Sequence, residues 1–439
     1  MIRLEVQHDF HPVGQGLFAS GLVHLSRVGG SIVANAVPLG PDDPTYRWVY
    51  DCGTCSKQAL VTREIARLKR EFGDSRIDLL TLSHFDHDHV SGVVRLLNAL
   101  PARIVMLPYA PLWERLLIGF DQGFVAGDEA LGFFVNPVAY LAQAAPERFD
   151  EVLFVPRSNG EGRPPFLEPG DLPVDSGEPG ELRGKPEYGP DRGDPEFDEE
   201  MEGLSGPSSG IRVNSLRRGG SISLYGYWEF VPYNDPTLAP LDRHAFAASV
   251  APLRDKLVDG SESERTAALA LLRDTYDEEF TRPKRNDTSL FLYGGPSEQF
   301  ENFAGGGFRL PAKLANWPLP RRSGYFPQSP KILMTGDGVL KEEDQFDRLR
   351  SSLGPWRLEG LGTLQVMHHG AKSCWHEGLA GKFRPATSVI SSNPSDGRTR
   401  HPSPEVLRDF WPYEPVQVDQ HIGLRLWFRG VSPMLGHGR

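Results

Sequence analysis

The chain has 439 residues, enough for two or three average domains or for one domain with large insertions. Its hydrophobic content of 39% allows a substantial core, and its net charge of −11 argues against broad, non-specific adhesion to nucleic acid. No stretch is apolar enough to span a bilayer, the first residues lack a signal-peptide pattern, and three cysteines make no disulfide framework. These features predict a cytoplasmic protein with no membrane partner.

The N-terminal part is predicted to form strands followed by a helix. Residues 21–25 and 31–34 alternate or run apolar as hairpin strands do, and residues 47–50 form a further strand. The apolar spacing in residues 56–72 is typical of an amphipathic helix. Asp51 lies at a strand end, where its carboxylate is placed to orient a neighbouring metal-binding loop.

Cys52 and Cys55 follow as a C-x-x-C pair between strand and helix. This spacing is that of a thioredoxin-type redox pair, but a single pair is a weak signal. Structural zinc normally needs four ligands, and Cys374 alone does not complete them. The redox and zinc interpretations are therefore the less favoured alternatives.

The densest polar stretch is residues 83–92, which read Ser-His-Phe-Asp-His-Asp-His-Val-Ser-Gly. The apolar run 77–82 before it predicts a buried strand, and residues 93–100 after it predict a helix. Imidazole and carboxylate groups at a strand end suit zinc, manganese or iron, and a solvated polar loop is the less favoured alternative. The metal-capable side chains are His84, Asp86, His87, Asp88 and His89.

The middle of the chain changes character between residues 157 and 210, where Pro, Gly, Asp and Glu dominate. Such a segment buries too little apolar area to offset its ordering entropy, so we expect it to be largely disordered and to act as a solvated linker. Around it the pattern predicts a strand at 103–107, a strand pair or one long bent strand at 221–230, helices at 112–120 and 139–145, and two helices within 245–276.

From residue 286 onward, strand after strand has a polar side chain at one end. Asp337 follows the apolar run 331–334, and His368 and His369 follow 364–367. This repetition predicts one sheet edge with one site. Asn286 precedes the strand 289–293, and Asn393 follows the strand 388–390.

His401 comes next, on a loop that also contains Arg398 and Arg400. The imidazole is placed to contact a scissile phosphate or to protonate a leaving group, and the arginines to neutralise phosphate charge. The alternative is a solvated loop with no role in the site.

The motifs resemble those of a known superfamily. The H-x-D-x-D-H of His84 to His89 resembles the H-x-H-x-D-H signature of metallo-β-lactamase-fold hydrolases, with Asp in place of the second His. The closest resemblance is to the hydrolase domain of the DNA-uptake channel protein ComEC and its soluble stand-alone relatives. That family also shows a V-G-Q-G opening, N-x-x-S-L, T-G-D, H-H-G and H-P, matched here at 13–16, 286–290, 335–337, 368–370 and 401–402.

The resemblance implies an α/β (α+β) fold, the αββα sandwich of two mixed sheets with helices on both outer faces. Its two halves would correspond to residues 1–107 and 286–439, separated by a large insertion at 108–285. The stretch 157–210 lies within that insertion.

The resemblance also implies a site for two divalent metal ions, zinc or manganese, with magnesium as a further option. His84 and Asp86 would hold one ion, Asp88 and His89 the other, and Asp337 would bridge them. His368 or His369 would complete the second site, and the sequence does not decide between them. The usual histidine between the first loop and the bridging Asp has no counterpart, and the anionic Asp86 favours manganese or magnesium over zinc.

The remaining roles follow from this arrangement. Asp88 and His401 are predicted to be catalytic, while Asp51, His87 and Asn286 are predicted to support the metal-binding residues.

The first functional hypothesis is a soluble dinuclear-metal hydrolase of phosphodiester bonds, a nuclease that acts alone or with operon-encoded protein partners in a cytosolic assembly such as a defence system. The second is a small-molecule phosphoesterase or a lactone or thioester hydrolase, which the acidic composition favours. The third is a catalytically weak metal-binding regulatory subunit, which the missing histidine favours. The expected partner is accordingly a nucleic acid or a phosphoester substrate.

Overall fold

The computed structural model describes most of the chain. The predicted strand at 31–34, most of 157–210, and residues Asn286, Arg398 and Arg400 lie outside the described residues. The described residues are 2–27, 44–128, 130–158, 182–189, 200–201, 203–204, 210–235, 244–279, 289–297, 300–311, 329–395 and 401–432.

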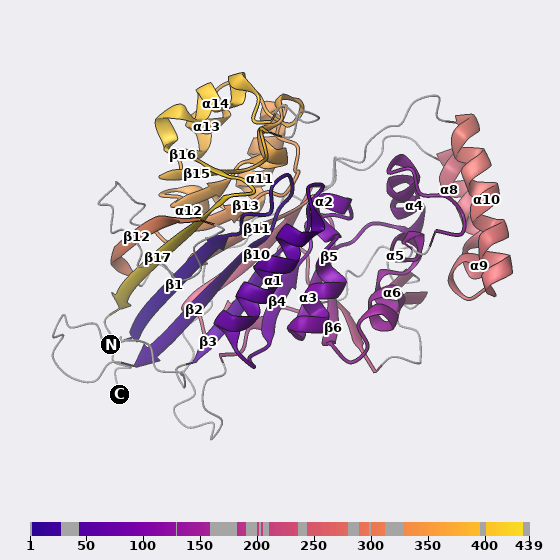
Figure 1. Cartoon of the computed structure of the whole chain (residues 1–439), viewed down its shortest axis with the longest axis horizontal. Helices are drawn as coiled ribbons and strands as arrows, with labels where there is room; N and C mark the ends of the chain where they lie inside the picture. Colours follow the sequence, from indigo (N-terminus) through magenta and orange to yellow (C-terminus); the bar gives the residue numbers. More distant parts are fainter. Residues whose placement is uncertain are drawn as a thin grey trace.

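Two mixed sheets, A and B, form the centre of the molecule (Figure 1). Nine described strands make up sheet A, in the order β12 (Glu301–Pro311), β17 (Ile422–Ser432), β1 (Ile2–Phe10), β2 (Ala19–Arg27), β3 (Thr45–Tyr50), β4 (Ile77–Thr81), β5 (Ala102–Pro108), β6 (Phe149–Val155) and β8 (Arg212–Ser215). Eight described strands make up sheet B, in the order β16 (Pro415–Val418), β15 (Thr387–Ser391), β14 (Thr363–Gln365), β13 (Ile332–Met334), β11 (Leu290–Pro296), β10 (Trp228–Asn234), β9 (Ile222–Leu224) and β7 (Lys185–Pro186).

Each sheet contains a run of parallel strands. In sheet A, β3 to β6 and β8 are parallel, and in sheet B, β13 to β16 are parallel. Parallel neighbours direct their carboxyl ends to the same edge, which is where binding residues gather in α/β sheets. Antiparallel strands complete each sheet, among them β1, β2 and β17 in sheet A and β9, β10 and β11 in sheet B.

Three apolar cores separate the layers. The pleat sends alternate residues of a buried strand to opposite faces. In β4, Leu79 belongs to the core between the two sheets, whereas Leu80 belongs to the core beneath the helices on sheet A. A third core lies between sheet B and its own helices and includes Leu333 and Leu364. The layers are therefore helix, sheet, sheet and helix, which confirms the expected αββα sandwich.

Helices cover both outer faces. Over sheet A lie α1 (Gln58–Phe72), α2 (His87–Val90) and α3 (Val93–Ala99). The same apolar core continues beside them through α4 (Leu112–Asp121), α5 (Leu131–Val135), α6 (Pro137–Ala144), α8 (His244–Val250), η2 (Ala251–Leu253), α9 (Arg254–Val258) and α10 (Glu262–Glu279). With sheet B lie α11 (Glu343–Leu353), α12 (Pro355–Leu358), η3 (Met367–Gly370), η4 (Lys372–Cys374), α13 (Leu379–Phe383), α14 (Pro404–Phe410) and η5 (Trp411–Tyr413).

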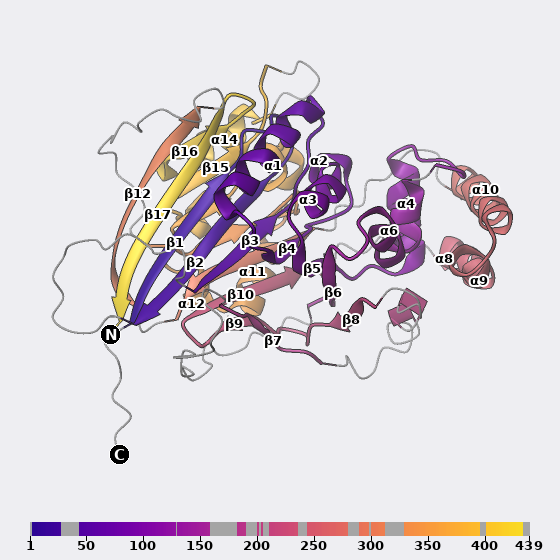
Figure 2. The same ribbon diagram turned by 60° about the horizontal axis from the view of Figure 1, so that its bottom comes forward.

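The helices α4 to α6 and α8 to α10 gather at one end of the molecule, as Figures 1 and 2 both show. Phe120 of α4 contacts the rings of Phe246 and Tyr276, so segments far apart in the chain form one apolar group. The stretch 108–285 also supplies strands to both sheets. Its division from the two halves at 107 and 286 stays a prediction.

The secondary-structure predictions are largely confirmed. The helix expected at 56–72 is α1, the strand expected at 77–82 is β4, and residues 221–230 form the pair β9 and β10. The region 245–276 differs from the two helices expected, because α8, η2 and α9 precede the long α10. Pro252 accounts for the break, since proline lacks the N–H that a helix interior requires. Within the described residues, no helix is both long and apolar enough to cross a membrane.

His8 of β1 gives the fold a defined sensitivity to acid. The side chain is buried beside Trp48 and Phe428, and its Nε2 lies 2.9 Å from the Pro330 carbonyl oxygen. Burial lowers the pKa of His8 from 6.5 to about 4. Between these two values the unfolded chain binds the proton more readily than the folded one, so stability decreases as the pH falls from about 6.5 to about 4.

We therefore expect His8→Gln to reduce the loss of unfolding free energy over that pH range by about 3 kcal/mol. Urea unfolding at several pH values measures it, with the exposed His421→Gln as the control. Equal pH slopes for His8→Gln and the wild type would contradict the assignment.

Candidate metal centre

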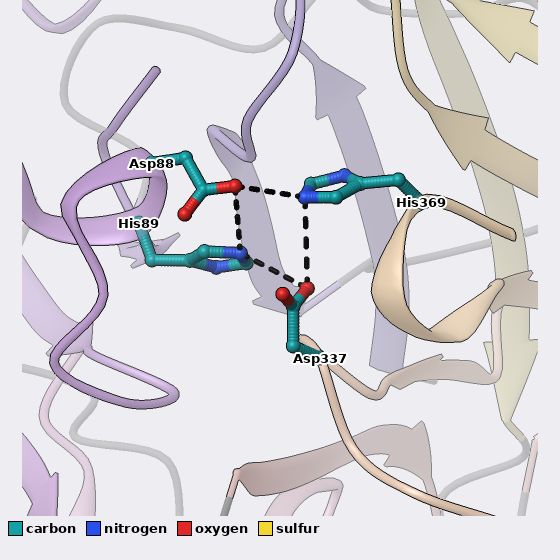
Figure 3. A group of neighbouring side chains, drawn as sticks. All are labelled: Asp88, His89, Asp337 and His369. Atoms are coloured by element: carbon teal, nitrogen blue, oxygen red, sulfur yellow. Dashed lines mark hydrogen bonds and ion pairs between the residues drawn. The ribbon is translucent and has the colours of Figure 1, made fainter. Parts of the chain in front are cut away.

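The turn after β4 presents two of the predicted ligands. Helix α2 begins directly after Asp86, and its first turn directs Asp88 and His89 toward Asp337 and His369 (Figure 3). The backbone of this turn is fixed from the side, because Leu17 N donates to the Asp88 carbonyl and Cys52 N to the His89 carbonyl. Gly53 is required there, since a Cβ at this position would lie 2.5 Å from the Asp88 carbonyl oxygen.

Sheet B presents three more of the predicted ligands from the ends of neighbouring strands. Asp337 follows β13, and the side chain of Gln365 accepts hydrogen bonds from the backbone N–H groups of Thr335 and Gly336 and so fixes its turn. His368 and His369 follow β14 with φ angles of 45° and 56°. Non-glycine residues rarely adopt this left-handed conformation, and such strain concentrates at functional sites.

Asp88, His89, Asp337 and His369 converge on one point (Figure 3). Each offers a ligand atom, and these atoms all lie within 4.8 Å of one another. His369 Nε2 lies 3.0 Å from Asp88 Oδ2, and His89 Nε2 lies 3.0 Å from Asp337 Oδ1. Two imidazoles and two carboxylates in this arrangement are a donor set that suits a divalent cation.

The second oxygen of Asp337 faces a different pair of histidines. His368 Nε2 lies 3.5 Å from Asp337 Oδ2, and His84 Nε2 lies 3.8 Å from the same atom. Asp86 Oδ2 also lies 3.8 Å from His84 Nε2. The two oxygens of Asp337 thus face two separate groups of donors.

In each of these four histidines, Nδ1 is held by a partner on the side away from Asp337. His89 Nδ1 lies 2.7 Å from Asp51 Oδ2, and Asp51 also accepts hydrogen bonds from the backbone and side chain of Ser83. A partner on one ring nitrogen fixes the ring and directs the other nitrogen toward a metal. The remaining partners of Nδ1 are Ser83 Oγ at 2.8 Å for His84, Cys374 Sγ at 3.0 Å for His368 and the Ser391 carbonyl at 2.6 Å for His369.

Buried atoms at the centre support its fit to a cation. His84 Nε2, His89 Nε2 and Asp337 Oδ1 are buried and have no hydrogen-bond partner of suitable geometry. Leaving such atoms unsatisfied costs about 1–3 kcal/mol each, and cations on the two sides of Asp337 would satisfy them. These residues therefore fit a divalent metal.

The electrostatics of the centre lead to the same conclusion. Burial would raise the pKa of the Asp337 carboxyl, but His89, followed by His368 and His369, holds that pKa well below its ordinary value. Burial would likewise lower the pKa of His89, yet the surrounding carboxylates, first that of Asp337, raise it well above its usual range. The clustered carboxylates require a positive charge between them, and a metal ion would take the place of the His89 proton.

His84 differs from His89. Burial, together with the neighbouring His89, lowers the pKa of His84 to about 4. The imidazole of His84 is therefore neutral at pH 7, which is the form that binds metals.

Two predicted residues lie farther from the centre. His87 is exposed, and its role in support of the ligands stays a prediction. His401 lies beside the centre, with its ring centroid 6.0 Å from that of His368. Gly370 permits this approach, because a Cβ there would lie 2.7 Å from Pro402 Cβ.

The C-x-x-C pair does not form a disulfide. Cys52 is buried and Cys55 exposed, and both are free thiols.

Three polar residues that sequence analysis missed hold the centre together. Ser83 links Asp51 to His84, and Gln365 fixes the turn before Asp337. Gln122 Nε2 donates to Asp86 Oδ1 at 2.7 Å. The position of Ser83 directly before the metal-binding motif was a usable signal, whereas Gln122 and Gln365 lie in ordinary helical and strand patterns.

We expect Asp51→Asn to weaken metal binding about 10–100-fold, because the neutral amide supports the His89 imidazole less well than a carboxylate does. Isothermal titration of the metal-free protein with manganese or zinc measures the dissociation constant. Asp74→Asn, at an exposed carboxylate between α1 and β4, is the matched control. An unchanged constant in a folded Asp51→Asn protein would contradict this role.

The chain was compared with known proteins and with sequence models of protein families. No curated protein matches the chain. Residues 39–193 match the sequence model of the Metallo-beta-lactamase superfamily. The matched range contains Asp51 and the residues from His84 to His89, while Asp337, His368, His369 and His401 lie beyond it. The match implies metal-dependent hydrolase chemistry in general, and the two mixed sheets with their outer helices are consistent with the metallo-β-lactamase fold.

Proposed function

We propose that this protein is a dinuclear-metal hydrolase that cleaves phosphodiester bonds. The observation that carries the proposal is the carboxylate of Asp337, whose two oxygens face two separate groups of imidazoles and carboxylates. A carboxylate placed between two such groups suits a pair of ions roughly 3.5–4 Å apart.

The chain's own residues divide into two ligand groups. Asp88, His89 and His369 lie on the Oδ1 side of Asp337. On the Oδ2 side are His84 and His368, and Asp86 lies next to His84. His368 thereby takes the place of the histidine that the sequence lacks between the first motif and Asp337. Bound divalent ions would act as Lewis acids, activating water and offsetting charge on the phosphate.

His401 is proposed to serve the leaving group. Its ring lies next to that of His368, at the border of the second ligand group, and its side chain is half-buried. An imidazole in this place can transfer a proton to a departing oxygen. Asp88 is proposed to contribute to catalysis through the position of its carboxylate between His89 and His369.

Nucleic acid is the first proposed substrate, cleaved by the protein alone or within a cytosolic assembly with other proteins. The resemblance of the motifs to the ComEC-type hydrolase domain supports this choice. A small phosphoester is the second candidate. It is favoured by the net charge of −11 and by an apolar cavity beside Asp86, since long duplex DNA binds chiefly through basic side chains.

We expect manganese-, magnesium- or zinc-dependent cleavage of fluorescent single- or double-stranded DNA or RNA, and a loss of more than about 100-fold in Asp88→Asn and Asp337→Asn, or about 3 kcal/mol in activation free energy. Asp74→Asn should retain activity. Hydrolysis of an aryl phosphodiester without cleavage of nucleic acid would favour the second candidate, a small phosphoester substrate. If the protein binds metal but hydrolyses none of these esters, a regulatory metal-binding protein would be indicated instead.

The number of ions tests the two-group arrangement directly. We expect about two ions per chain in the wild type, about one in His368→Ala and in His369→Ala, and fewer than one in Asp337→Ala, because Asp337 faces both groups. Elemental analysis after dialysis measures the stoichiometry, and His421→Ala, at an exposed histidine, is the control. Full occupancy in His368→Ala would contradict its assignment as a ligand.

A further inference from the structure

A cavity of about 300 Å³ adjoins the turn that carries the metal-binding motif. Its walls come from α2 and α3 on one side and from α5, α6 and the segment after α4 on the other. The rings pack as tilted and edge-on pairs, with centroids 5.3 Å apart for Phe85 and Phe133 and 5.5 Å apart for Phe133 and Tyr140. The principal apolar walls are Phe85, Val90, Phe124, Phe133, Tyr140 and Leu141.

The cavity is connected to the metal centre through one side chain. Gln122 lines the cavity, and its amide donates to Asp86 Oδ1 at 2.7 Å and to the Phe85 carbonyl at 3.3 Å. Asp86 in turn lies 3.8 Å from His84 Nε2. Within the motif, Phe85 and His87 line the cavity while His84 and Asp86 lie at the centre, so the same turn borders both spaces.

The side chains that line the cavity indicate which kind of ligand it would bind. Among the described residues, no lysine, arginine, aspartate or glutamate lines the cavity, and the polar lining residues are His87, Ser91, Gln122 and Tyr140. Ser91 Oγ already accepts hydrogen bonds from Thr54 N and Gln58 Nε2, and Gln122 is engaged with Asp86. A nucleobase needs partners for its polar edge, which these groups supply poorly. An uncharged hydrocarbon group needs none.

We propose that this cavity binds an apolar group of the ester substrate, an aromatic ring or a short branched hydrocarbon, while the ester lies at the metal centre. The volume is at the lower end for small-molecule pockets, which suits one or two fused rings. This inference rests on the proposed hydrolase function, and it favours the second candidate substrate, a small phosphoester with an apolar substituent, over nucleic acid.

Filling the cavity tests the binding of that group. Ala144 lines the cavity on α6, so Ala144→Leu places a larger side chain in it. Ala142, on the same helix and half-buried like Ala144, does not line it, so Ala142→Leu is the matched control. If Ala144→Leu fails to fold, Ala130→Leu, at a half-buried lining residue outside the helices, fills the same space.

The probe is 2-naphthol, titrated by calorimetry into the metal-loaded and the metal-free protein. We expect saturable binding in both forms, a dissociation constant raised about tenfold or more in Ala144→Leu, and no more than a twofold change in Ala142→Leu. Failure of 2-naphthol to bind, or equal weakening in both variants, would overturn the inference. Tighter binding of adenosine or uridine than of 2-naphthol would also overturn it, in favour of a base-binding cavity.

Hydrolysis provides the second measurement and separates the two proposals. Two p-nitrophenyl phosphodiesters with the same leaving group are compared, one with a methyl and one with a naphthylmethyl ester. We expect kcat/KM to favour the naphthylmethyl ester about tenfold in the wild type, and this preference to disappear in Ala144→Leu but not in Ala142→Leu. Equal kcat/KM values in the wild type would overturn the substrate role of the cavity. Binding of 2-naphthol without hydrolysis of either ester would overturn the hydrolase function and leave the ligand class of the cavity standing.

Discussion

The structure depends on placing one carboxylate, that of Asp337, between histidines from both sheets. Asp337 comes from sheet B, and His84 and His89 come from sheet A, some 250 positions earlier in the chain. Burying several carboxylates together is costly unless positive charge lies between them. These buried carboxylates lie at the edge where the parallel strands of both sheets end. The Leu290 N–H to Ser83 carbonyl hydrogen bond joins the two sheets beside the same centre.

Rigid support surrounds this costly group of charges. Asp51, itself in a left-handed conformation, holds both Ser83 and the His89 ring. On the opposite side, His368 and His369 share the same unfavourable backbone conformation, and His368 N donates to the Gly336 carbonyl. Consecutive residues in this conformation direct their rings to different sides of Asp337. Because of this strained backbone, the two neighbouring histidines approach different oxygens of the Asp337 carboxylate.

Much of this was readable from the sequence, because the signals are local. Five imidazoles and carboxylates at a strand end marked the first part of the centre, and polar groups after apolar runs marked Asp337 and the histidine pair. The choice between His368 and His369 was not readable, since it depends on backbone angles that spacing does not encode. Gln122 and Gln365 were missed for a related reason: each acts through a hydrogen bond across the fold, and nothing in its neighbourhood distinguishes it from a surface glutamine.

The metal-binding turn has two faces, and this geometry bears on how chemistry and selectivity are combined. Alternate residues serve different spaces, with His84, Asp86 and Asp88 toward Asp337 and its histidines, and Phe85 and His87 toward the cavity. The two sheets supply the first face, while helices from the middle of the chain supply the walls opposite the second. A group bound in the cavity would therefore press on the same short backbone that holds the ligands. Under the proposed function, changes in the middle helices would alter which substrate is accepted without changing any of the proposed metal ligands.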